Sequence, residues 1–574
     1  LSTRDLPRVA SVQSLLDADD EAYFLVAQFQ RRPISDQPLR AEAARFLSQA
    51  TFGPTRAAVD ALVASSFDDW LLAELEKPPT LHLDRVLAQF PADGRFYDEN
   101  GQPLRELTGL PFDSFWRAAI EGNDQLRQRM AFALSQILVV SIDSNIERVP
   151  QALAQYMDIL TRGAFGNYRD LLEEVTYSPA MSIYLTYLRN QKADRRTGRV
   201  PDENYAREIL QLFTVGLVEL QPNGKATTDS QGNELEIYDN TDITELAKVF
   251  TGLSFAGAGF RAPLQNIPLE AFYSPLVMFD EFHSPEAKRF LGGVIPAGTP
   301  GRESISQALD IIFADPNLGP FIGRQLIQRF VTSAPPRAYV RRVATAFDNG
   351  VYTLPEGQQV GSGQRGNLAA VIAAVLFDPV ARDLEPRADP EHGKLREPGL
   401  RFTHWARAFE VNSADTLNQR ILRNTGSPAL LGQQPYGAPS VFNFYRPGYI
   451  AVGKETGDAG LTAPELQITN ASSIIGYPNL LTTYVLGRSP TYSQGLPDAF
   501  AADYSRYAAL AGNTPAMLDA LDLILTHGTL TSETRERIGE VLELLRSDTP
   551  EQQLLSAQAA IIMIMTSPEY IVLR

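Results

Sequence analysis

The sequence predicts a mainly helical protein, with a large multi-helical body and small β-hairpin insertions. Apolar residues recur at three- and four-residue steps along most of the 574 residues, as they do on one face of a helix. Alternating, strand-like runs are few and short. The composition, 44% hydrophobic and 21% charged, is ordinary for a globular protein and supplies enough apolar material for a large core.

The helical period is visible from the N-terminal end of the chain. It runs through SVQSLLDADDEAYFLVAQFQ (11–30), AEAARFLSQATFG (41–53) and TRAAVDALVASSFDDWLLAELEK (55–77). Gly53 and Pro54 form a helix stop, and Thr55 is placed to cap the helix that follows. By the same criterion, further helices are predicted at 123–141, 150–163, 167–190, 203–214, 242–252, 301–313, 318–331, 336–348, 367–377, 394–410, 464–485, 515–526, 531–546 and 550–566.

Strand signals are local. FYDENGQPLREL (96–107) and KATTDSQGNELEIY (225–238) are predicted hairpins that turn at Asn100-Gly101 and Gly232-Asn233. Neither has the acidic spacing of a calcium-binding EF-hand loop. The predicted domains are an N-terminal helical extension (1–40), a main helical domain (41–424), and a long irregular loop with C-terminal helices packed on the main domain (425–574).

The composition excludes several classes of function. The chain has 51 Lys and Arg against 68 Asp and Glu, a net charge of −17, and a surface this acidic repels nucleic acid and anionic lipid. It has no cysteine, so disulfides, thiolate nucleophiles and Cys-ligated metals are excluded. No apolar run reaches the ~18 residues of a membrane span. The lack of cysteine, together with a chain that begins at Leu1 rather than Met, predicts a periplasmic or secreted protein whose leader has been removed.

The stretch PDENYAREILQLFTVG (201–216) is predicted to form an amphipathic helix. Tyr205 lies on its apolar arc, and Asp202 is placed to cap its first free N–H groups. Glu203 and Arg207 have the four-residue spacing of a helix-stabilising ion pair. A solvated polar face accounts for this pattern; in the alternative interpretation, Arg207 and Glu208 point into a cleft.

The segment NDQLRQRMAFALSQILVV (123–140) is apolar almost all round from residue 130 onward, which predicts a buried helix. Arg129 and Gln136 lie on one line along it. A buried guanidinium requires a carboxylate or several carbonyl acceptors. We expect Arg129 to meet Glu208, Asp202 or Glu203, either in a structural ion pair or at the floor of a pocket.

Histidine spacing predicts no metal site, because no two of the five histidines have the spacing of metal ligands. In FDEFHSPEAKRFLGG (279–293), His283 follows Asp280 and Glu281 and precedes a helical turn that is expected to start at Pro285. It is a candidate general acid or base, or a structural hydrogen-bonding group.

Two further motifs have structural interpretations. GSGQRG (361–366) fits the G-x-G-x-x-G string of dinucleotide sites but lacks the buried strand that must precede it, so a helix–helix connection is predicted and no cofactor is expected. FNFYRPGY (442–449) gathers four aromatic residues around Arg446 and Pro447. Such a cluster either pins the long loop to the body or stacks sugar rings, and pinning is the preferred interpretation.

Several ordered motifs together resemble a large bacterial family of unknown function, DUF1800. These motifs are AARFLSQATFGPT (43–55), QLRQRMAFALSQILVVS (125–141), PDENYAREILQLFTVGL (201–217), DITELAKVFTGLSF (242–255), FHSPEAKRFLGG (282–293), GKLREPGLRFTHWARAF (393–409) and LGQQPYGAPSVFNFYRPGY (431–449). The resemblance extends from about residue 41 to MTSPEYIVLR at 565–574.

The resemblance implies a mainly helical, exported protein, whose relatives are often encoded beside another exported family, DUF1501. It also implies a role for Asn204, Tyr205, Arg207, Glu208 and His283 beyond surface polarity. The sequence departs from the family pattern at Ser284, where Asp is usual, and at Leu253, where Trp is usual. The first departure argues against a His-Asp metal site.

Two functions fit these observations. The first is a hydrolase that acts on an envelope or extracellular polysaccharide, with Glu208 as general acid or base, Arg207 as a clamp, Arg129 as an orienting group and His283 as an auxiliary acid or base. Glycoside hydrolysis needs two carboxylates. Glu203 lies about 140° round the helix from Glu208, so the second must come from elsewhere, for example Asp242, Asp280 or Glu281. The alternative is a non-catalytic envelope scaffold that binds a partner, such as another exported protein.

Overall fold

The computed structural model describes residues 36–90, 105–383, 389, 391–411, 422, 425–487, 502–545 and 549–574. The helix predicted at 11–30 and the turn of the hairpin predicted at 96–107 lie outside these residues.

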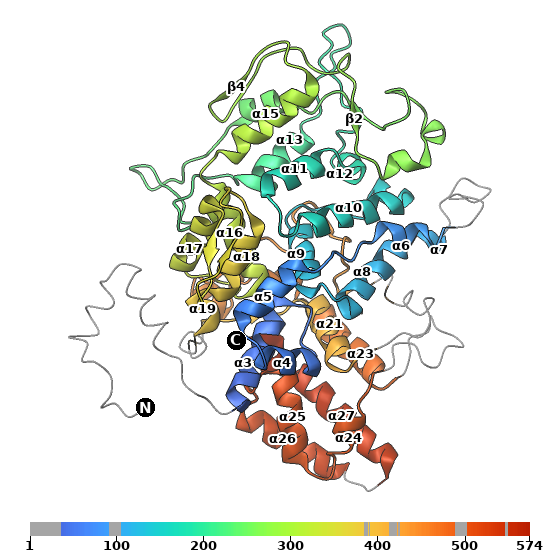
Figure 1. The fold of residues 1–574 in the computed structure, drawn as a ribbon, viewed down its shortest axis with the longest axis vertical. Helices are drawn as coiled ribbons and strands as arrows, with labels where there is room; N and C mark the ends of the chain where they lie inside the picture. The colour runs from blue at the N-terminus through green and yellow to red at the C-terminus, as the bar shows by residue number, and fades with distance from the viewer. Residues whose placement is uncertain are drawn as a thin grey trace.

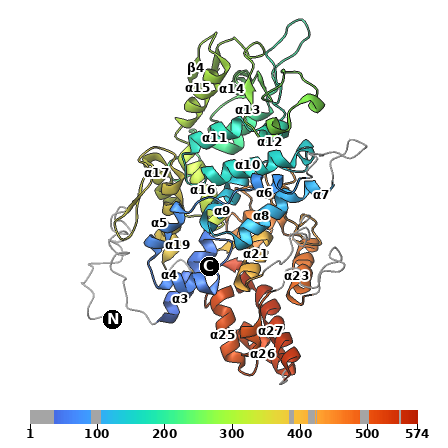
Figure 2. The same ribbon diagram turned by 45° about the vertical axis from the view of Figure 1, so that its right-hand side comes forward.

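The described chain is an elongated stack of helices, which confirms the predicted fold class (Figures 1 and 2). The upper group contains α11 (Tyr168–Thr176), α12 (Pro179–Tyr184), α13 (Asn204–Glu208), α14 (Asn240–Ala247) and α15 (Gly301–Phe313). The central group contains α5 (Phe67–Glu76), α6 (Leu83–Leu87), α7 (Arg105–Thr108), α8 (Leu110–Glu121), α9 (Gln125–Ser135), α10 (Pro150–Gly163), α16 (Leu318–Phe330), α17 (Arg337–Asn349), α18 (Leu368–Phe377), α19 (Pro379–Arg382), α21 (Pro398–Ala408) and α23 (Ala471–Val485). The lower group contains α3 (Asp36–Ala50), α4 (Arg56–Val63), α24 (Ser505–Ala508), α25 (Thr514–Leu525), α26 (Ser532–Leu544) and α27 (Pro550–Met565).

Short helices and hairpins complete the described chain. The short helices are α22 (Glu455–Asp458), α28 (Pro568–Ile571) and 3₁₀ turns at Asn145–Arg148, Leu264–Asn266, Leu269–Phe272 and Pro464–Ile468. Four antiparallel pairs join β1 (Leu253–Ser254) to β2 (Val277–Met278), β3 (Lys288–Phe290) to β4 (Gly293–Ile295), β5 (Tyr352–Thr353) to β6 (Gln359–Val360), and β7 (Lys394–Leu395) to β8 (Val572–Leu573). The excursion predicted at 225–238 is present as isolated bridges, including Thr228 to Glu234.

Helices α9 and α18 form the centre of the fold, because every one of their residues is buried. A single hydrophobic cluster extends from Ala43 on α3 to Tyr570 near the end of the chain. The predicted domain boundaries at 40 and 424 stay a prediction. Among the described residues, no helix is both long enough and apolar enough to cross a membrane.

Several predicted helices are divided in the structure, because a capping residue or a proline within the predicted range starts a new helix. The helix predicted at 55–77 divides into α4 and α5, because the side chain of Ser66 caps α5 by accepting a hydrogen bond from Asp69 N at 3.1 Å. The helix predicted at 167–190 divides at Pro179, which starts α12. The segment predicted to be helical from residue 394 instead begins as β7.

Candidate functional site

The stretch at 201–216 forms an amphipathic helix, as predicted, but the N-cap position is Glu203, which makes no side-chain cap, and not Asp202. Asp202 Oδ1 accepts a hydrogen bond from Asn204 N at 2.9 Å, and Glu203 pairs with Arg207 at 3.4 Å. After Glu208 the helix widens into a π-helix, Ile209–Thr214. The arginine side chain is 40% exposed, so Arg207 lies at the surface and its ion pair adds little stability.

Tyr205 packs inside the core. Its hydroxyl lies 2.8 Å from Thr176 Oγ1, and its ring stacks on Tyr187 with the ring centroids 4.3 Å apart. Burial raises the pKa of Tyr205 above its ordinary value. These contacts give Tyr205 a packing role within the described structure.

Glu208 is half-buried, and its Oε2 atom is buried without a hydrogen-bond partner among the described residues. Burial raises the pKa of Glu208, and the charge of Arg207 opposes the rise. Burial and then the Glu208 carboxyl raise the pKa values of Tyr184 and Tyr238 to about 12. Glu208 therefore lies among tyrosines.

His283 is a buried structural histidine in this structure. Its Nδ1 donates a hydrogen bond to the carbonyl oxygen of Thr251 at 2.9 Å, and its Nε2 accepts one from Lys288 Nζ at 3.1 Å. Burial lowers the pKa of His283, and the nearby Lys288 lowers it further. The helical turn predicted at Pro285 is absent from these described residues; β3 follows instead.

Arg129 meets a different acid from those predicted. It lies on α9, is 1% exposed, donates a hydrogen bond to the carbonyl oxygen of Arg329 and faces the ring of Phe330 at 4.6 Å. Burial lowers its pKa to about 10, and the carboxylate of Glu397 opposes that shift. Among the described residues, no hydrogen bond or ion pair connects Arg129 to Glu208, Asp202 or Glu203, so the predicted contact is not formed.

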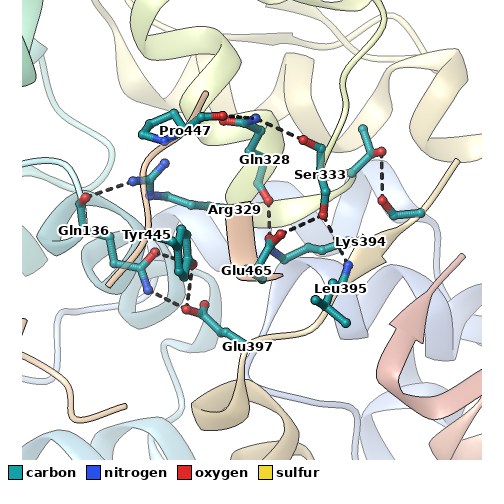
Figure 3. Close-up of polar contacts among 12 residues, drawn as sticks. Gln136, Gln328, Arg329, Ser333, Lys394, Leu395, Glu397, Tyr445, Pro447 and Glu465 are labelled. Atoms are coloured by element: carbon teal, nitrogen blue, oxygen red, sulfur yellow. Dashed lines mark hydrogen bonds and ion pairs between the residues drawn. The ribbon is translucent and has the colours of Figure 1, made fainter. Parts of the chain in front are cut away.

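A buried polar network surrounds Glu397 instead (Figure 3). Glu397 Oε2 accepts hydrogen bonds from Gln136 Nε2 at 2.8 Å, Gln433 Nε2 at 2.6 Å and the Tyr445 hydroxyl at 2.8 Å. Burial acts to raise the pKa of Glu397, but the charges of Lys394 and Arg129 and the bonds from Gln433 and Tyr445 hold it below its ordinary value. The carboxylate whose charge acts on Arg129 therefore comes from the segment before α21, although no described hydrogen bond or ion pair joins the two side chains.

A second buried carboxylate extends this network. Glu465 Oε1 accepts a hydrogen bond from Lys394 Nζ at 2.6 Å, and Glu465 Oε2 accepts one from Ser333 Oγ at 2.8 Å (Figure 3). Arg329 donates to the carbonyl oxygens of Gln325 at 3.0 Å and Gln136 at 2.9 Å. The Tyr445 hydroxyl lies 3.1 Å from Gln136 Oε1 at the end of α9, and Gln328 Nε2 on α16 donates to the carbonyl oxygen of Pro447 at 2.9 Å, so the long loop after residue 425 is tied to both helices. The preferred interpretation of FNFYRPGY is confirmed for Tyr445, which pins the loop.

A cavity of about 430 Å³ lies above this network, and we call it the arginine cavity. It is lined by Gln136 and Ile137 and by side chains from residues 211–224, 320–329 and 441–448. Three of the lining residues are Arg324, Arg329 and Arg446, and none of the described lining residues is Asp or Glu. This is unusual in a chain whose net charge is −17.

None of the three arginines forms an ion pair with a carboxylate among the described residues, although the charges of Glu397 and Glu465 act on Arg329. Arg324 has no described hydrogen bond or ion pair, and burial and then Arg337 lower its pKa. The Nε atom of Arg329 is buried without an acceptor. The guanidinium of Arg446 only faces the ring of Phe442, at 4.4 Å. Free guanidinium donors beside apolar walls are suited to an anionic ligand with an apolar surface.

Few features of the sequence indicate this site. Three segments behind the family resemblance, 125–141, 201–217 and 431–449, line the cavity, and 393–409 supplies Glu397 beneath it. The sequence signal for Lys394 and Glu397 is the run of charged residues immediately before the helix that starts at Pro398. Nothing in the helical pattern of 318–331 marks Arg324, because exposed and cavity-facing arginines have the same spacing.

Comparisons with known proteins place the chain only at the level of a family. Residues 45–572 match a family described as "Protein of unknown function (DUF1800)". Neither the curated proteins nor the solved structures contain a match.

Proposed function

Starting from the fact that this chain belongs to the DUF1800 family of proteins of unknown function, we propose that it binds a carboxylate-bearing polysaccharide in the arginine cavity. The observation that carries the proposal is the set of three arginines that form no ion pair with a carboxylate among the described residues. An arginine donates two parallel hydrogen bonds to a carboxylate, which gives both attraction and orientation.

The other walls of the cavity favour a sugar over a simple anion. Phe321 and Phe442 present aromatic surface, and Gln211 and Gln325 present amide donors and acceptors. Sugars offer apolar C–H faces and many hydroxyl groups, so they use both kinds of contact. Binding is favoured over hydrolysis at this cavity, because hydrolysis needs two carboxylates and the described lining has none.

Replacing Arg324 by methionine is expected to weaken binding of oligogalacturonate by about 10- to 100-fold, because one charge-assisted contact is lost. Isothermal titration with oligogalacturonate measures this change in Kd. Binding of the unaltered protein is also expected to weaken as salt is raised.

The matched control is Arg537→Met on α26, where the arginine pairs only with the equally exposed Glu533. This variant has the same net charge as Arg324→Met and should bind like the unaltered protein. If both variants bound oligogalacturonate equally weakly, the effect would come from overall charge and not from Arg324. If the unaltered protein bound neutral malto-oligosaccharide as tightly, the carboxylate would have no role in binding. If it preferred oligoglutamate, the ligand of the cavity would be an acidic peptide.

Saccharide hydrolysis is a second candidate function, and a different cavity favours it. This acidic cavity of about 760 Å³ is lined by Asp158, Asp170, Glu173 and Glu174 together with the rings of Tyr177 and Tyr273. Asp158 accepts hydrogen bonds from His82 N at 2.6 Å and Leu83 N at 3.3 Å, yet burial raises its pKa to about 6. A carboxyl group that holds its proton near pH 6 is suited to act as a general acid.

Hydrolysis at the acidic cavity is expected to require protonated Asp158. Its rate should therefore fall about tenfold per pH unit above about pH 6, and Asp158→Asn should lower it by about 100-fold or more. Reducing-sugar release from cellulose, starch, xylan and chitin measures both effects. The exposed Asp60→Asn on α4 is the control and should leave the rate unchanged. Activity retained by Asp158→Asn would exclude this assignment.

Export and partnership stay predictions from the sequence. A periplasmic or secreted location agrees with a polysaccharide ligand of the cell envelope. Pairing with another exported protein, as the DUF1501 association implies, is compatible with the binding proposal.

A further inference from the structure

A third, much smaller cavity lies between α9 and β7 and shares Lys394 with the network. It has about 10 Å³ of space, which is room for a single water-sized particle. Arg129, Lys394, Arg396 and His404 line it, with mostly apolar residues around them, and no Asp or Glu belongs to its described lining. We call it the small cavity.

The small cavity is rich in donors that lack acceptors. Nε and Nη1 of Arg129 are buried and have no hydrogen-bond partner among the described residues. Lys394 Nζ donates to the carbonyl oxygen of Gln328 at 2.8 Å and to Glu465 Oε1 at 2.6 Å, so one of its three protons is left over. Buried donors without acceptors are destabilising.

The acceptors around the small cavity are already engaged. His404 Nε2 donates to the carbonyl oxygen of Ile524 at 2.9 Å, so its Nδ1 is an acceptor, and Nδ1 accepts a hydrogen bond from Arg396 Nη1 at 2.7 Å. Thr51 Oγ1 accepts a hydrogen bond from Gly53 N at 3.1 Å. A water molecule here would find donors for its oxygen but few acceptors for its own protons.

The buried charges of this region also favour an anion over a water molecule. Four cations, Arg129, Arg329, Lys394 and Arg396, are at most 3% exposed, and the two carboxylates among them are Glu397 and Glu465. The buried region thus carries an excess of positive charge, which a low-dielectric interior does not tolerate without a counter-ion.

We infer that the small cavity binds a chloride ion. A monoatomic anion accepts hydrogen bonds from every donor that faces it, needs no acceptor and fits a single-particle space. Polyatomic anions such as sulfate or phosphate are too large for about 10 Å³. This inference is independent of the ligand proposed for the arginine cavity.

Chloride is expected to stabilise the full chain. At equal ionic strength, the thermal midpoint should be about 2–4 °C higher in sodium chloride than in sodium gluconate, because the ion binds only the folded state. Arg129→Met removes the free donors and should abolish this difference. Arg537→Met, far away on α26, should retain it.

Crystals soaked in sodium bromide give a readout that does not depend on any variant. A bromine anomalous peak between Arg129, Lys394 and Arg396 is expected. An ordered water without an anomalous peak would overturn the inference, as would equal midpoints in the two salts. The result does not bear on the arginine cavity, which is tested by oligogalacturonate binding.

Discussion

Replacing Glu397 by alanine is expected to lower the free energy of unfolding by about 3–5 kcal/mol, because it leaves buried charges without their carboxylate. Glu397 is fully buried, and both Lys394 and Arg129 act on its ionisation. The variant also removes the common acceptor of three hydrogen bonds, which are donated by Gln136, Gln433 and Tyr445. Urea titration followed by circular dichroism measures the loss.

The control for this prediction is Glu533→Ala. Glu533 pairs with Arg537 at 2.6 Å, but both side chains are more than 70% exposed. An exposed pair of this kind contributes at most about 1 kcal/mol. If Glu397→Ala lowered the free energy of unfolding no more than Glu533→Ala does, the buried network would contribute little to stability.

Replacing Gly361 by alanine is expected to lower the free energy of unfolding by about 3 kcal/mol or more. Gly361 has φ +112°, and a Cβ atom there would lie 2.2 Å from the carbonyl oxygen of Gly350. Neither the strained φ nor the collision with backbone can be relieved by rotating a side chain. Thermal unfolding followed by calorimetry measures the change.

Gly363 supplies the matched control within the same motif. It also has a positive φ, +75°, but a Cβ atom there meets nothing within 4 Å. Gly363→Ala should therefore cost only the conformational penalty of about 1–2 kcal/mol. Similar losses in the two variants would show that φ alone accounts for these glycines. A larger loss of stability in Gly361→Ala than in Gly363→Ala would show that glycine is required at position 361 because α17 and α18 pack closely there.

Local physics made much of the fold predictable from the sequence. The buried arc with Tyr205 and the ion pair of Glu203 and Arg207 depend on neighbours within a few residues. Helix interruptions were harder to foresee. At Ser66, a single side-chain cap starts a new helix although the apolar periodicity continues through this position. The periodicity alone therefore does not predict the boundary.

The site was less predictable, because its contacts join distant segments. The sequence predicts that Arg129 meets an acid of 202–208, but its guanidinium donates to the carbonyl oxygen of Arg329, and the acid whose charge acts on it, Glu397, is more than 250 residues away. His283 was weighed with its sequence neighbours Asp280 and Glu281, whereas its ring contacts Lys288 and Thr251. Composition does not reveal which side chains share a cavity.

The pairing of β7 with β8 has a consequence for how the chain acquires its structure. Lys394 is in register with Leu573, and Arg396 donates its backbone N–H to Ile571 and its Nε to the carbonyl oxygen of Tyr570, at 2.9 and 2.7 Å. During translation, residues 394–396 are made more than 170 residues before these acceptors. We therefore expect the cation-rich centre to close only after residues 570–573 are made, and closing so long a loop to be a late step of folding.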